Sequence, residues 1–161
     1  MKIKSIIDIY LSAKPKVRIL IDMIQYAILT AVGLLFPYPK IPFSPLTNIF
    51  GVFLIIGGFC LHRSSHQVHK QAHEEPEKTE ELVTIGIYSK IRHPGYLGLI
   101  LVYLGFPFAS TSLLVFIPAL IFAYPLYIQA KKEEEFLIKK FGKEYQDYMK
   151  KVPWKFIPKI I

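Results

Sequence analysis

Residues 46–61 read Leu-Thr-Asn-Ile-Phe-Gly-Val-Phe-Leu-Ile-Ile-Gly-Gly-Phe-Cys-Leu, sixteen residues without a charge. A second uncharged run of the same length extends from Leu113 to Ile128. Apolar residues make up 52% of the chain, and nearly all of the charge lies outside these runs. Sixteen helical residues span roughly 24 Å, slightly less than the hydrocarbon core of a bilayer. This blocked pattern predicts a polytopic membrane protein rather than a soluble globule.

Two further apolar segments complete the hydropathy pattern. One extends from Ile19 to Phe36, and a shorter one extends from Tyr96 to Ala109. A short uncharged turn joins the shorter segment to the last one, which runs from Leu113 to about Ala130. The sequence therefore predicts an all-α membrane bundle of about four transmembrane helices, the last two forming a hairpin. The third segment is short and contains Pro107, so it either tilts and kinks or is buried among the others.

The positions of lysine and arginine set the expected orientation. Five basic residues precede the first apolar segment and nine lysines follow the fourth, whereas the loop between the first two segments contains only Lys40. Both termini are therefore expected in the cytoplasm, which requires an even number of spans and places residues 63–95 beside the C-terminal segment. Arg18 and Asp22, at the start of the first span, are expected to extend to the headgroups. No cleavable signal peptide is predicted, because residues 1–12 contain no small-residue cleavage site.

The net charge of +8 does not indicate a nucleic-acid partner in this context. Residues 141–161 combine lysines with aromatic residues, which is typical of an amphipathic segment on an anionic lipid surface. The same segment can alternatively cover a bound cofactor. The single cysteine, Cys60, excludes a disulfide framework. The expected partner is the lipid bilayer, and the sequence gives no indication of the oligomeric state.

The most informative motif occupies residues 82–98, Leu-Val-Thr-Ile-Gly-Ile-Tyr-Ser-Lys-Ile-Arg-His-Pro-Gly-Tyr-Leu-Gly. Pro94 suits the first turn of a helix, where its missing N–H removes no hydrogen bond. Arg92 and His93 then lie at a helix N-terminus, whose N–H groups favour a carboxylate or a phosphate. The alternative interpretation is a turn at the membrane surface with an arginine that extends to the headgroups.

Three consecutive glutamates, residues 133–135, stand where the fourth apolar segment ends. A carboxylate at this point can pair with Arg92 or bind a cationic cofactor. Tyr88 and Tyr96 can add aromatic faces to the same positive centre. The alternative interpretation is a solvated charge run among lysines.

The order and spacing of these motifs resemble the isoprenylcysteine carboxyl methyltransferase and phospholipid methyltransferase superfamily. The resemblance covers residues 82–158: Gly-Ile-Tyr-x-x-x-Arg-His-Pro-x-Tyr, a helical hairpin, Glu-Glu, then Phe-Gly-Lys-Glu-Tyr-x-x-Tyr and Val-Pro. It implies one membrane domain, with residues 1–62 forming N-terminal transmembrane helices and residues 82–158 forming the cofactor-binding catalytic core.

The resemblance further implies S-adenosylmethionine bound near the cytoplasmic surface. An apolar acceptor, such as a prenylcysteine carboxylate, a phospholipid amine or a hydrophobic thiol, would enter from the lipid. The implied cofactor-binding residues are Leu82, Val83, Gly86, Ile87, Tyr88, His93, Pro94, Tyr96, Glu133 and Glu134. Among the catalytic residues, Arg92 is expected to orient an anionic group of the acceptor. For an amine acceptor, His93 or a glutamate is the candidate base.

Four histidines form a further pattern: His62, His66, His69 and His73. Their spacing of four, three and four residues places them on one face if the second apolar helix continues outward. They can bind a metal, face a substrate or cofactor, or form an interfacial helix face. No metal is predicted, because no sulfur or well-placed carboxylate completes a site.

Two other function classes remain open. The C-terminal half is also similar to membrane reductases of the sterol or steroid type, which bind a nicotinamide cofactor. A small scaffold or transporter with a degenerate site is the non-enzymatic alternative. A soluble, Rossmann-type methyltransferase is not expected, because its glycine-rich signature is absent.

Overall fold

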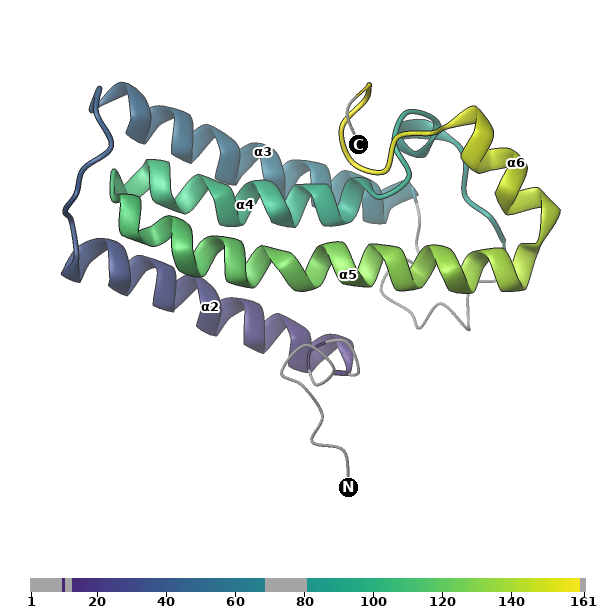
Figure 1. Cartoon of the computed structure of the whole chain (residues 1–161), viewed down its shortest axis with the longest axis horizontal. Coiled ribbons are helices and arrows are strands. Elements are labelled where there is room, and N and C mark those ends of the chain that lie inside the picture. Colours follow the sequence, from purple (N-terminus) through teal and green to yellow (C-terminus); the bar gives the residue numbers. More distant parts are fainter. Residues whose placement is uncertain (1–9, 11–12, 69–80, 160–161) are drawn as a thin grey trace.

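Four long helices form an antiparallel bundle in the computed structural model, which describes Tyr10 and residues 13–68 and 81–159 (Figure 1). The long helices are α2 (Pro15–Leu35), α3 (Leu46–Val68), α4 (Pro94–Ser110) and α5 (Phe116–Phe141). The shorter elements are the 3-10 turns η2 (Gly86–Ser89) and η3 (Leu113–Val115) and the helix α6 (Lys143–Lys151). This arrangement confirms the predicted all-α membrane bundle and its hairpin.

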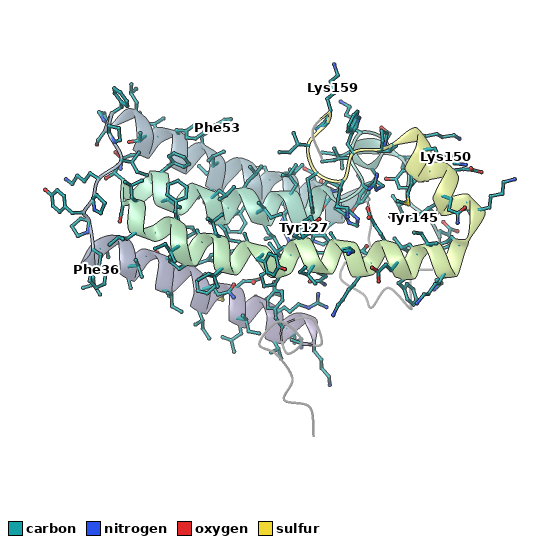
Figure 2. The ribbon with its side chains drawn as sticks, viewed as in Figure 1. Phe36, Phe53, Tyr127, Tyr145, Lys150 and Lys159 are labelled. Carbon is teal, nitrogen blue, oxygen red and sulfur yellow. The ribbon has the colours of Figure 1, made fainter. Side chains whose placement is uncertain are left out.

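Three segments are long and apolar enough to cross a membrane: Lys16–Leu35, Leu46–Val68 and Leu113–Phe141. The apolar helix α4 is shorter, with 17 residues, and contains the buried Pro107. The outer surfaces of the long helices carry many exposed apolar side chains. Phe36 and Phe53, for example, point away from the bundle (Figure 2). Such surfaces suit contact with lipid, so the bundle belongs in a membrane.

Backbone contact between two glycine pairs fixes α3 against α4. Gly51 and Gly58 on α3 face Gly105 and Gly98 on α4, and the members of each pair are seven residues apart on their helix. A Cβ atom at Gly98 would lie 2.5 Å from the carbonyl oxygen of Gly58. A Cβ atom at Gly51 would lie 2.1 Å from the backbone nitrogen of Ala109. Only glycine therefore permits this approach, which is typical of membrane helices.

The other side of α4 packs through larger side chains. Tyr103 is fully buried and lies in a cluster with Leu29 of α2 and small residues of α5 such as Ala119. The Tyr103 hydroxyl donates to the carboxylate of Asp22 at 3.1 Å and also contacts the side chain of Gln25. A polar contact inside the bundle thus helps to hold α2 beside α4.

The two ends of the bundle are formed by different segments of the chain. At one end, the α2–α3 loop and the α4–α5 turn meet: the Ser112 hydroxyl donates to the Phe36 carbonyl at 2.7 Å, and the Ile41 N–H donates to the Thr111 carbonyl at 2.8 Å. At the other end lie the start of α2, the end of α3, the start of α4, the end of α5, and α6 (Figure 1). The motif before α4 and the segment after α5 therefore share one end, as predicted.

Candidate functional site

The start of α4 is held by the segment that follows α6. Pro94 is the first residue of the helix and His93 is its N-cap residue, as the sequence predicted. The backbone N–H groups of Arg92 and His93 donate to the carbonyl oxygens of Trp154 and Lys155, each at 3.0 Å. The motif is therefore a fixed part of the fold and not only a turn at a surface.

Glu134 of α5 is buried at the centre of an ion-pair cluster. Its Oε1 atom accepts hydrogen bonds from Arg92 Nε at 2.7 Å and from His93 Nε2 at 3.1 Å. Its Oε2 atom lies 2.9 Å from Lys155 Nζ. Arg92 Nη1 also donates to the Val152 carbonyl at 2.8 Å. Arg92 thus pairs with a glutamate, one of the alternatives that the sequence left open, and Glu134 is not part of a solvated charge run.

The neighbouring Glu133 has a different environment. Its Oε2 atom accepts a hydrogen bond from the Tyr96 hydroxyl at 2.8 Å, and the Tyr96 ring stacks on His93 with 5.7 Å between ring centroids. Within the part of the chain that the structure describes, no lysine or arginine forms an ion pair with Glu133. Among the described residues, its polar contact is therefore the neutral Tyr96 hydroxyl and not an ion pair.

Two cavities meet beside Glu133. The larger has a volume of about 210 Å³ and is lined by residues from all four long helices. The smaller, about 30 Å³, lies between the segment before η2, the end of α5 and α6. Both cavities are lined by the same four residues: Tyr88, Arg92, His93 and Glu133. These four residues form the shared wall of the site.

The structure brings most of the predicted cofactor residues to these cavities. Leu82 and Val83 line the smaller one, and Tyr96 lines the larger one. Four predicted residues line neither cavity: Gly86, Ile87, Pro94 and Glu134. They lie close to lining residues in the sequence, within two positions of Tyr88, His93 or Glu133. Gly86, for example, begins η2 with a φ of +61°, a backbone conformation that favours glycine.

The smaller cavity is closed on one side by a compact aromatic cluster. Tyr145 and Tyr148 of α6 pack with Leu137 of α5, while Lys150 on the same helix points outward (Figure 2). The Tyr148 hydroxyl donates to the Tyr88 carbonyl at 2.7 Å. Burial, reinforced by the nearby Glu133 carboxylate, raises the pKa of the Tyr88 hydroxyl to about 12. The hydroxyl therefore keeps its proton at physiological pH.

The larger cavity also includes ionisable residues of α2 and α3. Arg18 and Asp22, which were expected to extend to the headgroups, line it from α2. His62 and His66 line it from α3, which supports the interpretation of a substrate- or cofactor-facing stripe, whereas His69 and His73 lie outside the described residues. An ionisable residue within an apolar helix was the available signal, because such residues usually mark functional sites.

Comparison with known proteins extends these observations. The family model described as phospholipid methyltransferase matches residues 46–144. Protein-S-isoprenylcysteine O-methyltransferase of Homo sapiens is 27% identical over 127 residues, which cover 72% of this chain and 43% of that protein. The Saccharomyces cerevisiae enzyme of the same name is 32% identical over 120 residues, which cover 68% of this chain and 48% of the enzyme.

A Delta(14)-sterol reductase of Mus musculus is also similar, with 31% identity over 80 residues, 48% of this chain and 19% of the reductase. The chain spans less than half the length of each of these curated relatives. The family match includes α3, the motif at the start of α4, the helical hairpin and both glutamates. The chain therefore belongs to the phospholipid methyltransferase family.

Proposed function

We propose that this protein transfers a methyl group from S-adenosylmethionine to an apolar or lipid-like acceptor at the cytoplasmic face of a membrane. The observation that carries the proposal is the wall between the two cavities, where the Glu133 carboxylate lies beside the aromatic rings of Tyr88 and Tyr96. Carboxylates and aromatic faces both stabilise a cation such as a sulfonium. A methyl donor is also what the family requires.

The residues around the smaller cavity offer contacts suited to part of this cofactor, and because this cavity has only about 30 Å³ the rest of the molecule would extend along the shared wall into the larger cavity. Leu82 and Val83 offer apolar surface for an adenine ring, and Tyr145 offers an aromatic edge. Glu133 offers carboxylate oxygens to the hydroxyl, amino or sulfonium groups. When bound, the cofactor supplies a methyl carbon that is already activated by positively charged sulfur. The protein has only to align the acceptor with this carbon and to exclude water.

The larger cavity fits the acceptor. Ile19, Leu99 and Leu126 give it apolar walls, and Arg18 and Asp22 add polar groups. This mixture suits a molecule with an apolar chain and a polar reactive head, such as an isoprenylcysteine carboxylate or a phospholipid amine. Position between membrane helices allows such a molecule to reach the site from the lipid.

The ion-pair cluster around Glu134 has a supporting role in this proposal. Glu134 and the Val152 carbonyl hold two nitrogens of Arg92, so the guanidinium presents a fixed positive charge at the cavity wall. That charge can orient an anionic group of the acceptor. His93, whose Nε2 atom donates to the same carboxylate, is held at the point where the cavities meet.

A binding experiment tests the function directly. Radiolabelled S-adenosylmethionine and NADPH are added separately to purified full-length protein in lipid nanodiscs. We expect saturable binding of S-adenosylmethionine, and methyl transfer to at least one member of a panel of prenylcysteine, phosphatidylethanolamine and hydrophobic thiols. Binding of NADPH alone would favour a reductase, the second candidate, which the similarity to the Mus musculus sterol reductase supports. Binding of neither would leave the scaffold or transporter alternative.

A reporter experiment tests the orientation. Reporters fused at Met1 and at Ile161 are expected to give cytoplasmic signals, and one inserted near Pro39 is expected to give the opposite signal. The loop that contains Pro39 lies at the end of the bundle opposite to the site (Figure 1). A cytoplasmic signal at Pro39 would place the site on the other face of the membrane.

A further inference from the structure

Asp22 is an acidic residue of α2 that two tyrosines hold at the wall of the larger cavity. Its Oδ1 atom accepts hydrogen bonds from the Tyr10 hydroxyl at 3.2 Å and from the Tyr103 hydroxyl at 3.1 Å. Both tyrosines are buried, and the Tyr103 hydroxyl also contacts Gln25, about one turn further along α2. Asp22 itself lines the cavity. Its carboxylate is therefore fixed at the cavity wall and does not extend to the headgroups.

The position of Asp22 makes its charge costly. The residue lies within the segment Lys16–Leu35, which is long and apolar enough to cross a membrane. An ionisable side chain in such a segment usually faces a functional cavity and meets an opposite charge there. The two tyrosine hydroxyls are neutral donors, and an ionised carboxylate can accept about four hydrogen bonds. Asp22 is thus placed to bind a positively charged group of a molecule in the cavity.

Arg18 adds the opposite charge beside Asp22. The two residues are four positions apart, so they lie on one face of α2, and both line the larger cavity. Arg18 Nε donates to the Ala13 carbonyl at 3.0 Å, which restricts where the guanidinium can point. Helix α2 therefore presents an anion and a cation side by side. This pair suits a ligand head that carries both signs, with its ammonium group toward Asp22 and its anionic group toward Arg18.

The charges on the other helices favour the same kind of head. Arg92 also lines the cavity, but its guanidinium bonds to the buried Glu134, so the protein itself balances its charge. Glu133 lines the cavity from α5 and adds a second carboxylate beside that of Asp22. A head that carries only a carboxylate would be repelled by both acids, whereas an ammonium group is attracted by both.

We propose that Asp22 is a specificity-determining residue for the methyl acceptor: it binds the ammonium group of an amphiphilic amine, and Arg18 binds the anionic group of the same head. Tyr10 and Tyr103 are its positioning residues. The proposal rests on the proposed function and deepens it, because it assigns the acceptor to the zwitterionic membrane amines rather than to the carboxylates. Asp22 lies outside residues 46–144, so the family match does not include it.

Two lysolipids with the same acyl chain test the proposal by binding alone. Lysophosphatidylethanolamine and lysophosphatidic acid share the phosphate and differ in the ethanolamine group. Both are offered at equal mole fraction to the full-length protein in nonionic detergent micelles, and calorimetry gives the two affinities. Asp22→Asn keeps an oxygen that accepts from both tyrosines but removes the charge. The ratio of the first affinity to the second is expected to fall by about tenfold to a hundredfold.

Two further variants complete the binding test. Tyr103→Phe removes one donor to Asp22 and is expected to lower the same ratio by about 2- to 12-fold. Asp147→Asn, on α6 and lining neither cavity, is the matched control with an unchanged ratio. Denaturant unfolding followed by circular dichroism shows that each variant is folded. Equal losses for both lysolipids in Asp22→Asn would mean that Asp22 only holds α2 beside α4, and would overturn the proposal.

Methyl transfer separates this proposal from the proposed function. In Asp22→Asn, the KM for lysophosphatidylethanolamine is expected to rise by tenfold or more, in line with the binding loss, whereas turnover of a prenylcysteine carboxylate does not fall. If S-adenosylmethionine binds and only the carboxylate is methylated, the function stands and the assignment of Asp22 fails. If S-adenosylmethionine does not bind, the function fails, and the lysolipid ratio still decides whether Asp22 selects an ammonium head. An unchanged ratio in Asp22→Asn overturns the proposal in either case.

Discussion

Glu133 and Glu134 are consecutive residues of the same helix, yet they occupy opposite kinds of environment. Glu134 is buried and pairs with the three basic side chains Arg92, His93 and Lys155. Glu133 borders both cavities and bonds to one neutral side chain, Tyr96. One residue step turns a helix by about 100°, which is enough to separate the two roles. The difference teaches that this acidic pair combines a carboxylate buried in an ion-pair cluster with one that faces the cavities.

The largest effect is expected from Glu134→Gln. The substitution leaves Arg92 and Lys155 without their buried counter-charge, so the free energy of unfolding should fall by about 3–5 kcal/mol. Denaturant unfolding in detergent micelles, followed by circular dichroism, measures this change. Glu135→Gln, at an exposed position of the same helix, is the control and should change stability by less than about 0.5 kcal/mol. Equal stability of the two variants would show that Glu134 does not stabilise the fold.

Arg92→Lys tests the same cluster from the other side. A lysine keeps the positive charge but cannot bond to Glu134 and to the Val152 carbonyl together. Loss of one charged hydrogen bond should lower the free energy of unfolding by about 1.5–3 kcal/mol. The same unfolding experiment measures it, with Arg63→Lys at an exposed position of α3 as the control. Wild-type stability combined with lost turnover would show that Arg92 acts mainly on the acceptor.

Glu133→Gln should have an effect of similar size on a different quantity. Stability is expected to stay within about 0.5 kcal/mol of the wild type, because no buried charge loses its partner. Affinity for S-adenosylmethionine should fall tenfold to a hundredfold, which corresponds to about 1.5–3 kcal/mol for one charge-assisted hydrogen bond. Calorimetry on nanodisc-embedded protein measures it. An unchanged affinity would mean that the cofactor is not held by this carboxylate.

The smallest effect is expected from Tyr148→Phe. It removes one hydrogen bond, from the Tyr148 hydroxyl to the Tyr88 carbonyl, and should cost about 0.5–1.5 kcal/mol of stability. Tyr124→Phe, on an exposed face of α5, is the matched control. Because Tyr88 belongs to the shared wall, a small loss of cofactor affinity should accompany the change. A variant that loses stability but keeps full affinity would separate α6 from the site.

The sequence predicted the helices well because hydropathy reports the apolar part of each one directly. It placed their polar ends less well. The second segment was expected to end near Leu61 but continues to Val68, and the fourth was expected to end near Ala130 but continues to Phe141. Backbone hydrogen bonding carries a helix through polar residues, and a hydropathy profile does not detect this. These extensions supply His62, His66 and both glutamates.

The motifs of the candidate site were predictable from the sequence, but the rotation of each helix about its own axis was not. The motif order identified Glu133 and Glu134 together, whereas their division of roles depends on how α5 is turned against α4. That rotation is set by the packing of Leu126, Ala130 and Leu137, which are buried on the same helix. The role of Asp22 similarly depends on Tyr103, 81 residues away in sequence. Such long-range contacts leave no local pattern.

The bonds between the motif and the carbonyls of Trp154 and Lys155 impose an order on biosynthesis. Arg92 and His93 leave the ribosome 62 residues before their backbone acceptors (154 − 92 and 155 − 93). At about 5–20 residues per second, this gap lasts roughly 3–12 seconds. A nascent chain that has reached Lys151 thus contains every membrane helix but lacks the carbonyls that hold the start of α4. The site can therefore be assembled only after residues 154 and 155 have been made.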